Sequence, residues 1–140
     1  MINPMQFLPG YALRRASAAV HNELAAALVP FDLRATEVSV LLLVEANPGV
    51  TQSELSRVLD IQRANMAPLA ARLAERGLID RERVDGRSHG LVLTAAGVAL
   101  TEDVGAVVST FEKRLTERVP LELRSHILPI LGALWARDPL

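Results

Sequence analysis

Apolar residues recur at helical spacing over most of the chain, which predicts a mainly helical protein. Near the N-terminus, one helical face carries Leu13, Ala16, Val20, Leu24 and Leu28. This pattern predicts a helix over residues 11–29, which Pro30 ends. A second apolar pattern predicts a helix over residues 35–46, closed by the Asn-Pro-Gly turn at 47–49.

A short helix is predicted next, because residues 51–54 (Thr-Gln-Ser-Glu) have the sequence of a capping box. In such a box the Thr51 hydroxyl accepts a hydrogen bond from the Glu54 N–H, and the Glu54 carboxylate reaches back. The residues of this helix predicted to face inward are Leu55, Val58 and Leu59. A tight turn is predicted at residues 60–62.

The following helix is predicted from apolar residues at positions i, i+3, i+4 and i+7, namely Met66, Leu69, Ala70 and Leu73. Gly77 is predicted to end it as a left-handed C-cap. Pro68 lies inside this pattern and leaves two interpretations open. Either the helix begins late, with Asn65 as N-cap and Pro68 in its first turn, or it begins near Gln62 and bends.

The helical period then gives way to a hairpin. Strands are predicted over residues 78–84 and 90–93, joined by a polar tip at 85–89 that contains an Asp-Gly turn signal. Thr94 is predicted to cap a long helix. The core stripe of that helix is predicted to be Val104, Val107, Val108, Phe111 and Leu115.

A last helix is predicted to begin with Pro120 at its first position and to run to about Trp135. Its apolar residues form two stripes, Leu123, Ile127, Ile130, Leu131 and Leu134 on one face and Leu121, Leu128 and Trp135 on another. A helix that is apolar around so much of its circumference needs burial on both sides. A homodimer with interdigitating terminal helices satisfies this need economically, and a helical monomer that buries the helix is the alternative.

Composition excludes several classes of protein. Half of the 140 residues are hydrophobic, so the chain is not a disordered one, and its length fits one domain. The absence of cysteine excludes disulfide scaffolds, thiolate zinc sites and cysteine nucleophiles. No apolar run approaches the ~18–20 residues of a membrane helix. The N-terminus lacks the pattern of a signal peptide, so a cytoplasmic protein without a membrane partner is expected.

Neither an enzyme nor a metal protein is expected. The serines have no nucleophile-elbow setting, and no glycine-rich loop lies between a strand and a helix. The three histidines are far apart in sequence and lack metal-ligand spacing, so no metal and no cofactor are predicted. The net charge of −1 hides a small local difference, since residues 51–90 hold seven arginines against six acids. That difference by itself does not establish nucleic-acid binding.

The order of the predicted elements is that of a winged helix-turn-helix. A helix, a capped helix, a tight turn and a further helix precede a two-stranded wing with a charged tip. In this arrangement the helix after the turn enters the major groove of DNA with its N-terminal residues at the base edges. The wing tip lies along the backbone and places an arginine in the minor groove.

Residues 33–100 resemble the MarR family of bacterial transcriptional regulators. Four motifs carry the resemblance: GVTQSEL at 49–55, LAERGLIDR at 73–81, DGRS at 85–88 and LTAAG at 93–97. The most specific is the Asp-x-Arg-Ser wing motif placed shortly before Leu-Thr-x-x-Gly. The absence of cysteine excludes the peroxide-sensing branch of this family.

The resemblance implies an obligate homodimer that binds a pseudo-palindromic operator, usually as a repressor. It also implies small, often aromatic or phenolic, ligands that weaken DNA binding. The whole chain, 1–140, is then one MarR-like domain. Its winged helix-turn-helix core spans 33–100, and residues 1–32 and 101–140 form a helical dimerisation region.

The candidate DNA contacts are Thr51, Gln52, Gln62, Arg63, Ala64, Asn65, Ala67, Arg72, Arg87, Ser88 and His89. Arg87 at the wing tip is the predicted minor-groove residue. Arg63 and Arg72 fit either phosphate contacts or ordinary surface charges. The candidate ligand-binding residues are Tyr11, Arg15 and His21, of which His21 also fits a dimer interface.

A second function class stays open on the sequence alone. The outer face of the predicted groove-binding helix carries Ala64, Pro68, Ala71 and Glu75, which offer few hydrogen bonds to bases. Base readout would therefore fall to Gln62, Arg63 and Asn65, with alanine contacts to thymine methyl groups. The alternative is a winged-helix protein-interaction module without operator-specific DNA binding.

Overall fold

The computed structural model describes residues 1–83 and 89–136 and divides into two compact units, Met1–Val107 and Val108–Leu140. Each unit is described by itself. The first contains η1 (Pro4–Phe7), α1 (Pro9–Leu28), η2 (Val29–Phe31), α2 (Ala35–Ala46), α3 (Gln52–Val58), α4 (Arg63–Glu75), β1 (Ile79–Arg83), β2 (His89–Leu93) and the start of α5 (Ala95–Glu117). The second contains the end of α5, η3 (Leu121–His126) and α6 (Ile127–Trp135).

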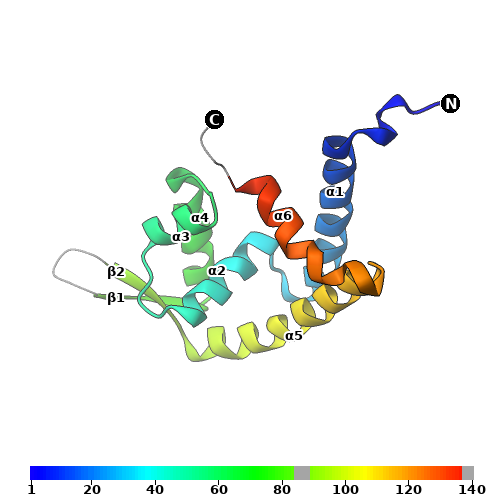
Figure 1. Cartoon of the computed structure of the whole chain (residues 1–140). Coiled ribbons are helices and arrows are strands. Elements are labelled where there is room, and N and C mark those ends of the chain that lie inside the picture. The colour runs from blue at the N-terminus through cyan, green and yellow to red at the C-terminus, as the bar shows by residue number, and fades with distance from the viewer. Residues whose placement is uncertain (84–88, 137–140) are drawn as a thin grey trace. The chain divides into compact units, whose positions relative to one another are not determined.

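The element order confirms the predicted fold class, a mainly helical winged helix-turn-helix (Figure 1). The core of the first unit lies among α2, α3, α4, the two strands and the start of α5. Its fully buried side chains include Val40, Leu41, Val44, Leu55, Met66, Leu73, Leu91 and Val104. By contrast, Leu28 alone is buried among the residues of α1, so most of that helix presents its side chains to solvent in the single chain.

The end of α3 differs from the prediction at Val58. Asp60 adopts a left-handed backbone with φ of 52°, and the Ile61 N–H bonds to the Ser56 carbonyl at 2.9 Å. This closes α3 after two turns in a Schellman-type cap. Val58 therefore lies at the outer end of the helix and is 62% exposed, so its predicted inward position is wrong.

The structure decides between the two interpretations of α4. Gln62 is the N-cap, Arg63 is the first helical residue and Pro68 lies inside the helix, so the late start at Asn65 is wrong. Because Pro68 has no N–H, the Ala64 carbonyl lacks its helical donor. At the other end Gly77, with φ of 68°, confirms the predicted left-handed cap.

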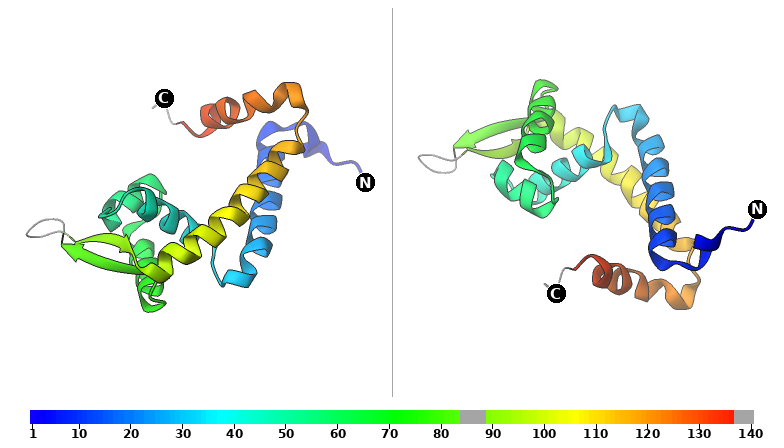
Figure 2. Two further views of the ribbon diagram at one scale, coloured as in Figure 1. Left: turned by 90° about the horizontal axis from the view of Figure 1, so that it is seen from below. Right: turned by 90° about the horizontal axis from the view of Figure 1, so that it is seen from above.

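The wing is a two-stranded antiparallel sheet in which Arg81 pairs with Leu91 and Arg83 pairs with His89. Its strands extend outward from the helices of the first unit (Figure 2). Val50, just before α3, forms an isolated bridge with Leu91, which ties the start of the helix-turn-helix to the wing. The hairpin tip, with Arg87 and Ser88, lies outside the described residues.

The junction between wing and α5 depends on a threonine and a glycine. The Thr94 Oγ1 accepts a hydrogen bond from the Gly97 N–H at 3.0 Å, and its hydroxyl donates to the Gly77 carbonyl. A Cβ atom placed on Gly97 would overlap the carbonyl oxygen of Leu78. Only a residue without a side chain therefore allows the first turn of α5 to lie this close to the Leu78 backbone, just before β1.

Further along α5, the predicted core stripe is only partly buried. Val104 is 1% exposed, whereas the other four predicted residues are half-buried in the single chain.

Within the second unit, the Arg124 guanidinium donates hydrogen bonds to the carbonyls of Val119 and Glu117, at 2.9 and 3.1 Å. These bonds give the carbonyls at the end of α5 the donors that the helix itself does not supply.

The start of the last helix differs from the prediction. Pro120 precedes a 3₁₀ helix instead of opening an α-helix, and α6 begins only at Ile127. No residue of α6 is buried in the described structure, and Leu128 and Trp135 are 80% and 79% exposed. The apolar side chains that the sequence predicts on two faces of this segment are therefore largely exposed in the single chain.

We expect Gly97→Ala to lower the free energy of unfolding by at least about 2 kcal/mol, because the new methyl group must displace backbone atoms of Leu78. Gly105→Ala in the same helix is the matched control, since nothing lies within 4 Å of a Cβ at that position. It should leave stability unchanged or raise it by about 0.5–1 kcal/mol. Equal urea midpoints for the two variants would show that the close approach at Gly97 is not needed.

Candidate nucleic-acid interface

The start of α3 is held by a complete capping box. The Thr51 Oγ1 accepts from the Glu54 N–H at 3.3 Å, and the Thr51 N–H and hydroxyl both donate to the Glu54 carboxylate at 2.8 Å. These hydrogen bonds from Thr51, backbone first, lower the pKa of Glu54 below its ordinary value. Thr51, a predicted DNA contact, thus already uses its hydroxyl to fix the helix start.

The start of α3 and the strands of the wing lie beside each other. One shallow hollow is lined by Thr51, Gln52 and Ser53 from the helix and by Arg81, His89 and Leu91 from the strands. Three of the predicted DNA contacts, Thr51, Gln52 and His89, are therefore brought together. Ser53 and Arg81 join them, although the sequence analysis did not select either one.

The start of α4 adjoins the same surface. Gln62 and Arg63 line a second hollow together with Ser53 and Arg57 of α3. Because Ser53 lines both hollows, the starts of α3 and α4 and the strands of the wing form one continuous face, here called the candidate interface. Ala64, Asn65 and Ala67, also predicted contacts, are exposed on α4.

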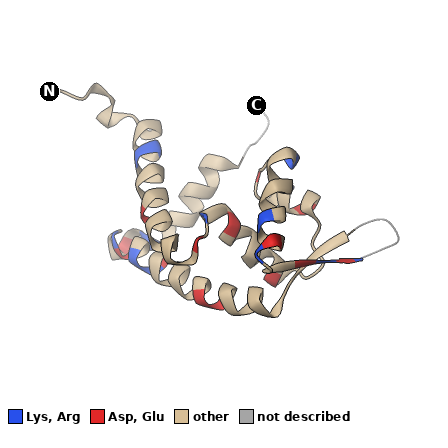
Figure 3. Ribbon diagram, turned by 180° about the vertical axis from the view of Figure 1, so that it is seen from behind, with Lys and Arg blue, Asp and Glu red and all other residues tan. Residues whose placement is uncertain are grey.

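The charges of this region are mixed in sign. Arg57, Arg63 and Arg81 are exposed, but so are Asp60 and Asp80. Figure 3 shows basic and acidic residues interspersed over the helices and strands of the first unit. Electrostatic attraction to a polyanion therefore depends on individual arginines, not on a uniformly basic surface.

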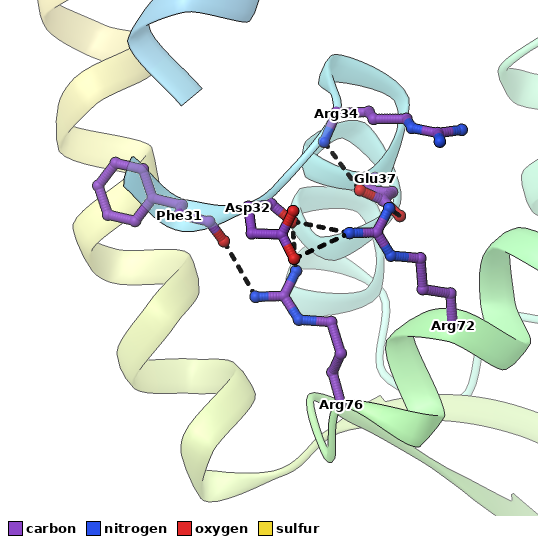
Figure 4. Close-up of polar contacts among 6 residues, drawn as sticks. All are labelled: Phe31, Asp32, Arg34, Glu37, Arg72 and Arg76. Atoms are coloured by element: carbon purple, nitrogen blue, oxygen red, sulfur yellow. Dashed lines mark hydrogen bonds and ion pairs between the residues drawn. The ribbon is translucent and has the colours of Figure 1, made fainter. Parts of the chain in front are cut away.

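Arg72, another predicted contact, is held by carboxylates (Figure 4). Its guanidinium forms ion pairs with Asp32 and Glu37, each at 3.2 Å, and donates to the Asp32 carbonyl at 3.1 Å. Glu37 is 2% exposed and also accepts from the Arg34 N–H at 2.8 Å. A phosphate bound to Arg72 would have to compete with these partners, so this arginine has a structural use in the folded chain.

Arg76 has an equivalent role that the sequence did not reveal. Its guanidinium donates to the carbonyls of Asp32 at 2.6 Å and Phe31 at 2.9 Å (Figure 4). Asp32 has a left-handed backbone with φ of 49°, which leaves its carbonyl accessible to both arginines. Arg72 and Arg76, here called the arginine clamp, thus attach α4 to the connector between α1 and α2.

The predicted ligand residues all lie on α1 but form no single cluster. The Tyr11 hydroxyl accepts from Arg15 at 3.3 Å and from Asn3 at 3.2 Å, and these hydrogen bonds, Asn3 first, lower the pKa of Tyr11. His21 is ten residues further on, about 15 Å along the helix axis. The structure thus brings Tyr11 and Arg15 together and leaves His21 apart.

Within residues 1–83 and 89–136, no three histidine, aspartate or glutamate side chains gather as a metal ion would require. None of the helices in these ranges has the length and apolarity that crossing a membrane demands.

Known proteins similar to this chain are transcriptional regulators. A MarR-family sequence profile matches residues 31–88. A putative transcriptional regulatory protein for the hcr operon of Thauera aromatica is 25% identical over 132 residues, which are 92% of this chain and 80% of that protein.

Similar solved structures cover nearly the whole chain. The transcriptional repressor CouR bound to p-coumaroyl-CoA is 35% identical with a TM-score of 0.88, covering 99% of both chains. CouR bound to a 23-mer DNA duplex is 37% identical with the same TM-score, covering 98% of this chain and all of that one. The Mycobacterium tuberculosis MarR family protein Rv2887 with salicylic acid is 30% identical with a TM-score of 0.71, covering 90% and 95%.

We expect Arg72→Ala to destabilise the protein by about 2–3 kcal/mol, because it leaves the buried Glu37 carboxylate without its ion-pair partner. The loss should fall short of that for a fully buried pair, since a third of the Arg72 side chain reaches solvent. Arg63→Ala is the control, because Arg63 is exposed and has no ion pair among the described residues. Urea unfolding of both variants checks this, and equal midpoints would contradict it.

Proposed function

The chain belongs to the MarR family of transcriptional regulators, and we propose that it is a homodimeric repressor that releases its DNA operator on binding an aromatic ligand. The MarR-family proteins similar to it are regulators and not enzymes. A protein that acts on chromosomal DNA in a bacterium works in the cytoplasm. The observation that carries the proposal is the candidate interface, which brings the starts of α3 and α4 and the strands of the wing onto one face.

We propose that α4 enters the major groove with its N-terminal residues at the base edges. Gln62, Arg63 and Asn65 are exposed there and carry the donors and acceptors that base edges recognise. Ala64 and Ala67 offer methyl contacts to thymine. Beyond them Pro68 and Ala71 contribute no side-chain hydrogen bonds, so few base contacts are available for each half-site.

The wing supplies the remaining contacts in this proposal. His89, at the end of β2 next to the hairpin tip, lies beside Gln52 and Arg81, and we propose that it contacts the DNA backbone. Arg87, with Ser88, is placed at the minor groove by its position in the wing motif, on grounds of sequence alone. With little direct readout, specificity rests on groove shape under the wing and on the spacing of two half-sites.

The homodimer follows from apolar side chains that the single chain does not cover. Among the described residues, none of α6 is buried, and α1 buries only Leu28. A monomer rarely exposes so many large apolar residues along a helix, and such surfaces mark interfaces. We propose that residues 1–32 and 101–140 form the dimerisation region, so that two copies present two α4 helices to one duplex.

The effector class is proposed from relatives and from α1. CouR has been solved with p-coumaroyl-CoA and Rv2887 with salicylic acid, both of which contain an aromatic ring and an acyl or carboxyl group. Tyr11 and Arg15 offer a ring and a guanidinium that suit such a molecule, with the guanidinium carbon 5.9 Å from the ring centroid. We propose an aromatic carboxylate or its thioester as the effector.

An insertion experiment tests operator binding. In a dimer the two α4 helices lie about 10–10.5 base pairs apart on DNA, so adding ~5 base pairs between half-sites turns one to the opposite side. We expect this insertion to abolish specific binding in a mobility-shift titration with DNA flanking the protein's own gene. Arg63→Ala should relax base preference at one or two positions per half-site, and Gln62→Ala should do less. Binding that tolerates the insertion and shows no base preference would instead identify a non-specific architectural protein.

A charge on α6 tests the dimer. Leu131 is 41% exposed in the single chain, so Leu131→Asp should be well tolerated by a monomer. In a dimer it buries an unpaired charge, which costs several kcal/mol, and the protein should dissociate or unfold. Sedimentation velocity measures the outcome, with Val58→Asp as control, because Val58 is 62% exposed and lies outside the proposed dimerisation region. A stable, folded 15.2 kDa species for the unmodified protein would overturn the dimer.

A further inference from the structure

Pro68 removes one hydrogen bond from the interior of α4. It is the sixth residue of a helix that begins at Arg63, so it lies beyond the first turn, where N–H groups have no helical acceptor in any case. Because proline has no N–H, the carbonyl of Ala64, four residues earlier, loses the donor that any other residue type would provide. Within the described residues, no donor from outside the helix bonds to this carbonyl.

The carbonyl without a donor lies on the exposed side of the helix. Ala64 and Pro68 are both exposed, whereas the opposite face of α4, with Met66, Ala70 and Leu73, is buried in the core. A proline ring crowds the carbonyl four residues earlier and turns such a carbonyl outward, away from the helix axis. The unpaired acceptor therefore belongs to the outer face of α4, which the proposed function directs into the major groove.

An unpaired carbonyl on this face needs a partner once DNA covers it. In the free protein, water can donate to the exposed carbonyl of Ala64, and burial against a base edge removes that water. An acceptor that is buried without a donor then costs free energy. The neighbouring side chains on the same face, those of Ala67 and Ala71, end in methyl groups and supply no donor. The donor must therefore come from the DNA.

Two bases present a donor in the major groove, adenine through its N6 amino group and cytosine through its N4 amino group, whereas guanine O6 and thymine O4 are acceptors. We infer that the Ala64 carbonyl, freed by Pro68, accepts a hydrogen bond from one of these amino groups, so that one position in each half-site requires adenine or cytosine on one strand. The inference rests on the proposed function. Pro68 is then a specificity-determining residue that acts through the backbone of Ala64.

The experiment compares Pro68→Ala and Pro68→Val with the unmodified protein. Both variants restore the N–H, and valine also keeps nearly the bulk of proline. Fluorescence anisotropy measures binding to the DNA fragment flanking the protein's own gene and to its single-base variants. It also measures binding to fragments whose preferred base lacks the amino group, with purine for adenine or 2-pyrimidinone for cytosine. Thermal unfolding checks the fold, and both variants should be at least as stable as the unmodified protein because a helix bond is regained.

We expect the unmodified protein to prefer adenine or cytosine at one position of each half-site by roughly two- to tenfold, the range for one hydrogen bond. Removing the amino group from that base should weaken binding by a similar factor. In both Pro68 variants this preference and the response to the amino group should disappear, while the ranking at other positions stays. Arg63→Ala should do the reverse, changing the ranking at other positions and keeping the response to the amino group.

The inference fails if Pro68→Val keeps the preference, which would assign it to side-chain bulk, or if the missing amino group weakens Pro68→Ala and the unmodified protein equally. It also fails if both variants lose affinity for every base variant alike, because Pro68 would then set the path of the helix and read no base. Each of these results leaves the proposed function intact, since the unmodified protein still ranks the base variants. An unmodified protein that binds no duplex, or all of them equally, overturns the proposed function itself and the inference with it.

Discussion

The arginine clamp attaches the C-terminal end of α4 to the connector between α1 and α2. The buried Met66, Ala70 and Leu73 pack the inner face of α4 into the core, whereas its outer face is small and exposed. Arg72 and Arg76 reach back to a connector about forty residues earlier in the chain, where the left-handed Asp32 presents its carbonyl and carboxylate. Since Glu37 is buried in the first turn of α2, the clamp joins the start of one helix to the end of another through a partly desolvated ion pair.

The clamp also relates α4 to α1. The carbonyls of Phe31 and Asp32 follow directly after α1 through the short η2 segment. A change in where α1 ends would therefore alter the acceptors of both arginines, and with them the position of α4. In the proposed function, α1 belongs to the dimerisation region and carries Tyr11 and Arg15. In that proposal the clamp connects the residues that follow α1 to α4, the helix proposed to contact DNA.

The wing is positioned by backbone contacts on both sides. Val50 bridges to Leu91 just before α3, and the Thr94 N–H bonds to the Leu78 carbonyl at 3.1 Å just before α5. Gly97 allows the first turn of α5 to approach the same carbonyl. The candidate interface therefore depends on contacts made by residues of the MarR-like motifs, namely Val50 of the first, Leu78 of the second, and Thr94 and Gly97 of the fourth.

Local signals in the sequence determined the element order and most helix ends. The capping box at Thr51, the left-handed Gly77 and the cap at Thr94 each act within a few residues, so the sequence alone predicts them and the structure confirms them. The late start of α4 and the inward Val58 were wrong. The spacing of apolar residues does not reveal the Schellman cap at Asp60. It also does not show that α4 accommodates a proline in its interior.

Tertiary structure alone decided which side chains meet. The partners of Arg72 and Arg76 lie far away in the sequence, and Arg57 gains its place beside α4 only when α3 packs against it. Charge and spacing along the chain do not distinguish an arginine that binds a buried carboxylate from one that stays exposed. That distinction depends on burial and on the direction of backbone carbonyls, which exist only once the helices have packed.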